Sequence, residues 1–134
     1  MKHNQTLLTS LLLTLTLSGC EQKLPADIEI PVLTAKEVAQ LESSSDGPIL
    51  LDVRTPKEFE KGRIPGSLNI PHKQLERRVS EISPYRERDI IVYCEKGGRA
   101  RYAIDVLRKL GFHNLALVEG DMGGWRKKGL HVER

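Results

Sequence analysis

Cys94 is the residue whose surroundings best suit covalent chemistry. It follows an apolar run at residues 90–93, and the loop at residues 95–99 then leads into a segment with helical spacing of apolar residues. Backbone N–H groups of a glycine-containing loop at a helix N-terminus bind anions, and the same dipole stabilises a thiolate over a thiol. We therefore expect Cys94 to be a nucleophile near neutral pH.

The residues after Cys94 are the expected anion-binding site: Glu95, Lys96, Gly97, Gly98 and Arg99. The two glycines let the backbone curl around a sulfur atom without Cβ clashes, and the arginine adds a fixed positive charge. A buried core thiol is the alternative interpretation of Cys94. A Gly-Gly loop that ends in arginine at a helix start has little structural reason to follow such a thiol, so the nucleophile is favoured.

The remaining elements must place this loop at one edge of a sheet. After Pro31, short β-branched apolar runs alternate with segments of helical period, which predicts parallel βαβ units. Capping-box spacing at Thr34 and Thr55 marks two helix starts, and Gly111 ends a crossover helix that includes residues 103–110. We expect one α/β domain over residues 31–134, a central parallel sheet flanked by helices, with strands at residues 49–53, 68–70, 90–94 and 115–118.

The first twenty residues have the pattern of a secretory leader. Lys2 lies in a polar start, and residues 7–17 form an apolar run that is shorter than the roughly 20 residues a helix needs to span a bilayer. Residues 17–20, Leu-Ser-Gly-Cys, resemble the bacterial lipobox, in which the peptidase cleaves before the cysteine and the cysteine is acylated. We expect a lipoprotein signal peptide at residues 1–19, lipidation of Cys20 and a polar tether at residues 20–30.

Lipidation of Cys20 implies a location in the cell envelope. Several acyl chains on one residue give stable membrane attachment, so the domain is expected to be lipid-anchored and to face the periplasm. An aspartate directly after such a cysteine usually signals retention in the inner membrane. Glu21 and Gln22 stand there instead, which favours the outer membrane. A secreted protein with an unmodified Cys20 is the alternative.

Composition narrows the function further. The 134 residues are 39% hydrophobic and 29% charged with a formal net charge of +3, as in a soluble globular domain. Basic clusters are interleaved with acids, so we expect no nucleic-acid binding. Two cysteines, Cys20 and Cys94, are too few for a disulfide scaffold, and neither has a second ligand at zinc-site spacing.

Three segments of the chain resemble the rhodanese family in its single-domain form: residues 51–71, the loop at residues 94–99, and residues 119–130. The resemblance implies an α/β fold in which Cys94 accepts a sulfane sulfur from a small anion such as thiosulfate. The resulting persulfide would pass its sulfur to cyanide or a thiol, with no metal or organic cofactor. Asp52 and Arg54 match the first motif, and we expect them to be structural residues that orient loops near the site.

Loop length separates this activity from its nearest alternatives. Cys94 and Arg99 enclose four residues, as in sulfurtransferases of this family, whereas the related dual-specificity phosphatases and arsenate reductases enclose five. Phosphatase or arsenate reductase activity therefore ranks second, and a noncatalytic rhodanese-like docking module third, because the intact loop counts against it. Glu95 beside the thiolate is expected to oppose doubly charged thiosulfate, and Lys96 to offset that effect.

Overall fold

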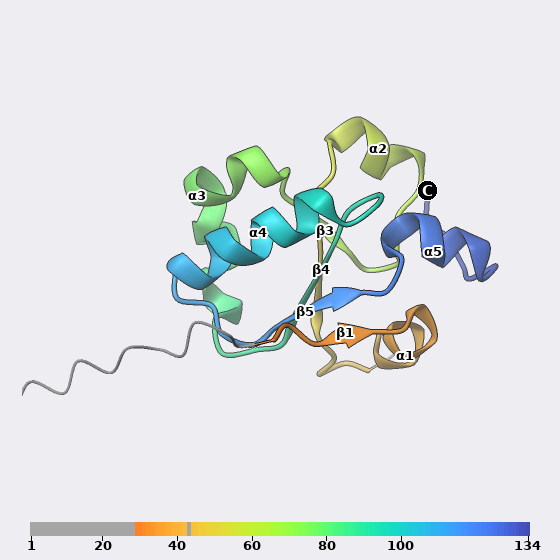
Figure 1. The fold of residues 1–134 in the computed structure, drawn as a ribbon, viewed down its shortest axis with the longest axis horizontal. Helices are drawn as coiled ribbons and strands as arrows, with labels where there is room; N and C mark the ends of the chain where they lie inside the picture. The colour runs from red at the N-terminus through yellow and green to blue at the C-terminus, as the bar shows by residue number, and fades with distance from the viewer. Residues whose placement is uncertain (1–28, 43) are drawn as a thin grey trace, which may run out of the picture.

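Five parallel strands form the centre of the molecule (Figure 1). The structure is a computed structural model and describes residues 29–42 and 44–134. The strands pair in the order β1-β5-β4-β2-β3, which confirms the expected parallel α/β sheet. Their bounds are β1 Val32–Leu33, β2 Ile49–Asp52, β3 Leu68–Asn69, β4 Ile90–Tyr93 and β5 Leu115–Val118.

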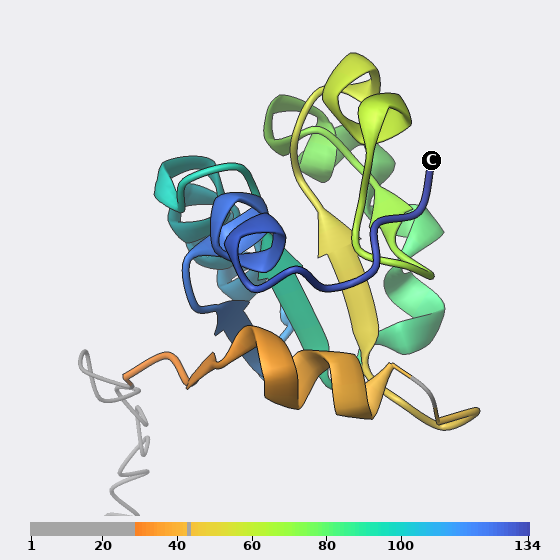
Figure 2. The ribbon, with the colours of Figure 1, turned by 90° about the vertical axis from the view of Figure 1, so that its right-hand side faces the viewer.

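Helices cover both faces of the sheet, with α1 and α5 on one face and α3 and α4 on the other (Figures 1 and 2). The helix α2 lies beyond the carboxyl end of β2, beside the site described below. The bounds are α1 Ala35–Leu41, α2 Pro56–Lys61, α3 Leu75–Arg78, α4 Gly98–Lys109 and α5 Asp121–Lys127, with 3-10 turns at His72–Gln74, Val79–Glu81 and Ser83–Tyr85.

Helix ends follow the local signals in the sequence. Thr34 and Glu37 form a reciprocal capping box at the start of α1, and Thr55 and Glu58 form a second one at the start of α2. In both, a threonine hydroxyl accepts a backbone N–H while the glutamate carboxylate accepts the threonine N–H, so both predicted capping boxes are confirmed. The crossover helix α4 was expected to include residues 103–110; it spans Gly98–Lys109, its C-cap is Leu110, and Gly111 follows with a φ of 87°.

The central strand β4 is buried along its whole length and sends alternate side chains to opposite faces. Ile90 and Val92 belong to the core cluster under α4, and Cys94 continues that series beyond the strand. Ile91 and Tyr93 belong to the cluster on the other face, which also contains Trp125 of α5. This register places Cys94 at the carboxyl end of β4, on the side that α4 covers.

The N-terminal predictions fall largely outside the described residues. The expected signal peptide at residues 1–19, Cys20 and most of the expected tether lie there. Within residues 29–42 and 44–134, no helix combines the length and the apolar character needed to cross a membrane. Ile30, which lies in the expected tether, packs against the core.

Candidate active site

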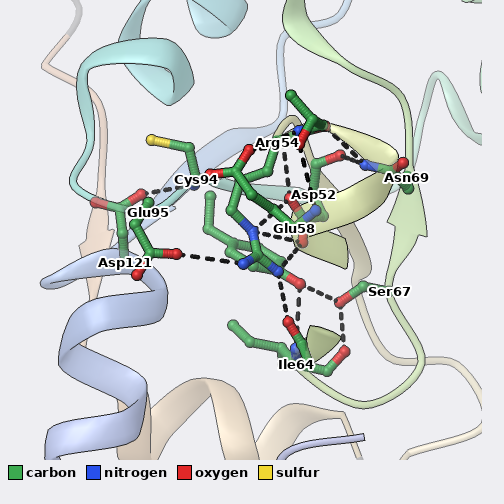
Figure 3. A network of polar contacts seen from close by, with 12 residues as sticks. Asp52, Arg54, Glu58, Ile64, Ser67, Asn69, Cys94, Glu95 and Asp121 are labelled. Carbon is green, nitrogen blue, oxygen red and sulfur yellow. Dashed lines mark hydrogen bonds and ion pairs between the residues drawn. The ribbon is translucent and has the colours of Figure 1, made fainter. Parts of the chain in front are cut away.

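Cys94 lies at the bottom of a tight loop between β4 and α4 (Figure 3). The residue is only 1% exposed, and its Sγ accepts a hydrogen bond from the Gly97 N–H at 3.0 Å. Figure 3 shows the sulfur pointing away from the ion pair of Asp52 and Arg54. The loop therefore curls back over its own cysteine and directs a backbone N–H at the sulfur.

Only one of the two loop glycines is required by the backbone. Gly97 precedes α4 with a φ of 108°, a conformation that residues with a side chain rarely adopt, and a Cβ there would lie 3.0 Å from Oδ2 of Asp121. Gly98 has no such φ, and a Cβ there would meet nothing within 4 Å. The tight turn around the sulfur thus depends on Gly97, while Gly98 simply opens the helix.

The start of α5 holds the other side of the loop. The Cys94 N–H donates to Oδ1 of Asp121 at 2.8 Å, and the Met122 N–H donates to the Cys94 carbonyl at 3.0 Å. Asp121 is the one residue other than glycine with positive φ, 53°, among the described residues. Sequence reasoning assigned Asp121 no role, although it follows a strand in one of the segments that carry the family resemblance.

Asp52 and Arg54 form a buried ion pair beside the loop. Arg54 Nε lies 3.1 Å and 3.0 Å from the two carboxylate oxygens of Asp52, and Nη2 lies 2.7 Å from one of them. Burial acts to lower the pKa of Arg54, but the hydrogen bonds and charge of Asp52 outweigh it and raise that pKa. Nη2 also donates to the Gly62 carbonyl at 2.7 Å, so the pair links the end of β2 to the end of α2.

Glu95 is held by two arginines. One carboxylate oxygen lies 3.2 Å from Nη1 of Arg54, and the other accepts from Arg126 on α5. From the sequence we expected Lys96 to offset the negative charge of Glu95. In the structure, the guanidinium groups of Arg54 and Arg126 contact the Glu95 carboxylate instead. Lys96 lines a surface hollow together with Lys127 and other residues of α5. The two guanidinium groups therefore largely compensate the charge of Glu95.

Arg99 turns toward α2, where Glu58 binds it. The two guanidinium nitrogens lie 2.8 Å and 2.9 Å from the two carboxylate oxygens of Glu58. The hydrogen bonds from Arg99 hold the pKa of Glu58 well below its usual range, and those to Glu58 raise the pKa of Arg99. Sequence reasoning expected a free positive charge at the anion site and did not include Glu58. An incoming anion has to compete with Glu58 for this arginine.

The side of the loop nearest α4 carries the other polar groups of the site. His72, Lys73, Arg99 and Tyr102 line a surface hollow of about 370 Å³ there, and the rings of His72 and Tyr102 meet edge to face at 5.9 Å. In the described part of the chain, no cluster of histidine, cysteine and acidic side chains could hold a metal ion. The described loop presents a buried cysteine with one backbone N–H directed at its sulfur.

A parallel α/β sheet whose central strand ends in such a loop defines a class of small cysteine-centred domains. The model of the rhodanese-like domain family matches residues 34–128, and the chain belongs to this family. This finding confirms the resemblance seen in the sequence and the fold that it implied.

The proteins that are similar to this chain are described with two different functions. A sulfurtransferase of Allochromatium vinosum is 29% identical over 75% of this chain and 92% of its own length. A thiosulfate sulfurtransferase of Pseudomonas aeruginosa superposes with a TM-score of 0.71 at 30% identity, covering 78% of this chain but 20% of that protein. A Rhodopseudomonas palustris protein of unknown function, described as a possible tyrosine phosphatase, superposes with a TM-score of 0.67 at 32% identity. The match covers 78% of this chain and 85% of that protein.

Proposed function

We propose that this chain is a sulfurtransferase that carries a sulfane sulfur on Cys94. The Cys94 thiolate attacks the outer sulfur of a donor such as thiosulfate, a new Sγ–S bond forms, and sulfite leaves with the electron pair of the broken S–S bond. A thiol or cyanide then attacks the terminal sulfur of the persulfide and restores the thiolate. The observation that carries the proposal is the Gly97 N–H at 3.0 Å from Sγ, at the end of the central strand.

Phosphate transfer is the second candidate, because one structural neighbour is described as a possible tyrosine phosphatase. Two features favour sulfur over phosphate. The loop encloses only four residues between Cys94 and Arg99, and the guanidinium of that arginine is already bound by Glu58. A dianionic phosphate needs a wide cradle and a free guanidinium fork, and this loop supplies neither in its present state.

The test compares both activities on the same purified protein. Thiosulfate should add the mass of one sulfur atom to the Cys94 peptide, and cyanide should remove it as thiocyanate. Cys94→Ser should lose both events, whereas the matched variant Cys20→Ser should keep them. Release of phosphate from an aryl phosphate, measured in parallel, should stay at background. Thiocyanate formation by Cys94→Ser, or phosphate release without sulfur loading, contradicts the proposal.

We also propose that Cys20 is acylated and anchors the domain in the cell envelope, facing the periplasm and on the outer membrane. The support is the Leu-Ser-Gly-Cys sequence at residues 17–20 with Glu21 after it. The mature protein should begin at Cys20, carry the mass of its acyl chains and sediment with outer-membrane fractions. Cys20→Ser should abolish both results. A wild-type protein that is released with an unmodified Cys20 contradicts the proposal.

A further inference from the structure

Three lysines line a surface hollow beside the cysteine loop. Lys96 comes from the loop itself, Lys127 is the last residue of α5, and Lys128 is the C-cap of that helix. The hollow has a volume of about 670 Å³, which is the size of a small-molecule binding site. The sulfur-transfer proposal assigns no role to the two lysines of α5 and its cap, so we ask what they could bind.

The hollow adjoins the loop because α5 is hydrogen-bonded to the loop backbone. The Met122 N–H donates to the Cys94 carbonyl at 3.0 Å, and the Gly123 N–H donates to the Glu95 carbonyl at 3.2 Å. A Cβ on Gly123 would lie only 3.3 Å from that carbonyl oxygen, so glycine lets the helix approach closely. Lys127 follows Gly123 by four positions, which places it one helical turn further along the same face.

These lysines carry positive charge that the protein does not neutralise. In residues 29–42 and 44–134, no ion pair involves Lys96, Lys127 or Lys128, and all three residues are exposed. The arginines of the site, by contrast, are each bound to a carboxylate. Two carboxylates line the hollow, Glu95 and Glu119, and the first of them is already bound by two arginines. The hollow therefore has an excess of positive charge.

A smaller hollow of about 240 Å³ continues this face along the loop. It shares Lys96 with the larger hollow, and Gly97 and Arg101 are among its other residues. The Gly97 N–H is the group that donates to Sγ at 3.0 Å, so the face extends to the backbone that contacts the sulfur. Arg101 is exposed and adds a further cation, while Asp121 in the same hollow is only 6% exposed. We call the two hollows together the cationic face.

We propose that the cationic face binds the carboxylates of the thiol that accepts sulfur, and that this acceptor is a small thiol with two or more carboxylate groups. The proposal rests on the Cys94 persulfide of the proposed function. The acceptor thiolate attacks the terminal sulfur of the persulfide, a new S–S bond forms, and the bond from Sγ to that sulfur breaks with its electron pair on Sγ. The terminal sulfur keeps its proton, so the acceptor leaves as a persulfide and Cys94 as a thiolate.

The size and position of the cationic face favour the acceptor over the donor. Thiosulfate is much smaller than the larger hollow, and its reacting sulfur has to enter the loop. An acceptor thiol also brings its sulfur to the loop, but the rest of the molecule stays outside, where its carboxylates can contact the lysines of α5 and its cap. Each such contact is a charge-assisted hydrogen bond, and the attraction also raises the rate of encounter. A neutral thiol gains neither effect.

The first experiment requires no sulfur donor. Alkylation of Cys94 is measured on the full chain with iodoacetate, an anion, and with neutral iodoacetamide, and the Cys94 peptide is quantified by mass separately from Cys20. Lys127→Gln combined with Lys128→Gln should lower the ratio of the iodoacetate rate to the iodoacetamide rate by about threefold at about 0.01 M salt. One charge about 10 Å away changes the local concentration of an anion by about twofold in water. At about 1 M salt the difference should disappear.

Lys73→Gln combined with Lys109→Gln is the matched control. It removes the same amount of charge, from the hollow on the α4 side of the loop and from the far end of α4. This control should retain most of the wild-type ratio. An equal loss in both double variants, or no loss in the variant of Lys127 and Lys128, overturns the proposal.

The second experiment measures how fast two thiols discharge the persulfide: mercaptosuccinate, a dicarboxylate, and uncharged 2-mercaptoethanol. Lys127→Gln combined with Lys128→Gln should slow the discharge by mercaptosuccinate at least about threefold and leave that by 2-mercaptoethanol unchanged. Equal slowing with both thiols, or slowing with neither, contradicts the proposal. Failure to load sulfur on Cys94 refutes the proposed function and the acceptor site together, and the alkylation ratio then decides separately whether the cationic face attracts anions.

Discussion

Removal of the Arg54 guanidinium is expected to destabilise the fold by about 3–5 kcal/mol, the range measured when one partner of a buried ion pair is deleted. Arg54→Met retains much of the side-chain volume but leaves the Asp52 carboxylate, 0% exposed, without its cation. It also removes the hydrogen bond to the Gly62 carbonyl at 2.7 Å and the contact with Glu95 at 3.2 Å. Domains are stable by about 5–15 kcal/mol, so the variant should lie close to unfolding.

Urea unfolding followed by the fluorescence of Trp125, the single tryptophan and only 1% exposed, measures this loss. Arg78→Met is the control, because its partner Glu81 is 50% exposed and such surface pairs contribute less than about 1 kcal/mol. Asp52→Asn combined with Arg54→Met should be more stable than Arg54→Met alone, since the buried charge is gone. The reasoning is refuted if Arg54→Met matches the control or if the double variant recovers nothing.

Two further predictions concern the loop and its neighbour. Gly97→Ala should lower the free energy of unfolding by about 1–2 kcal/mol or more, because φ is 108° there. It should also slow the alkylation of Cys94 by iodoacetamide. Gly98→Ala should leave the alkylation rate unchanged and be neutral or slightly stabilising in urea unfolding. Glu58→Gln preserves the capping box but not the ion pair. Since Arg99 depresses the pKa of Glu58, the pair stabilises the fold above about pH 4.5 and its contribution is lost as the pH falls further. At neutral pH, Glu58→Gln should therefore lower the free energy of unfolding by less than about 1 kcal/mol relative to the wild type. In acid this difference should vanish, and a difference that persists in acid contradicts the prediction.

Elements with short-range signals could be predicted from the sequence. The capping boxes at Thr34 and Thr55 each involve residues three positions apart, and β4 is a continuous apolar run. Two elements lacked such signals. The strand β1 has two residues, too few to show a period. The helix α5 contains two glycines, which disfavour helix formation, and it is held by burial of Trp125 instead.

The candidate site divides in the same way. Cys94 and its loop are contiguous in the chain, so residue types and spacing predicted their arrangement. Glu58 reaches Arg99 across 41 positions, and Asp121 reaches Cys94 across 27. Neither contact has a local sequence pattern, because both arise when separate strands end at one edge of the sheet. The roles of Glu58 and Asp121 as partners of the loop residues could therefore be identified only from the fold.

The slight exposure of Cys94 limits how it can oxidise. A disulfide requires two sulfur atoms about 2 Å apart, with their β-carbons within about 4 Å of each other. A cysteine that is 1% exposed beneath its own loop cannot bring Sγ that close to the same atom of a second copy while both loops stay folded. The low exposure of the thiol is therefore expected to slow disulfide formation between two copies of the chain.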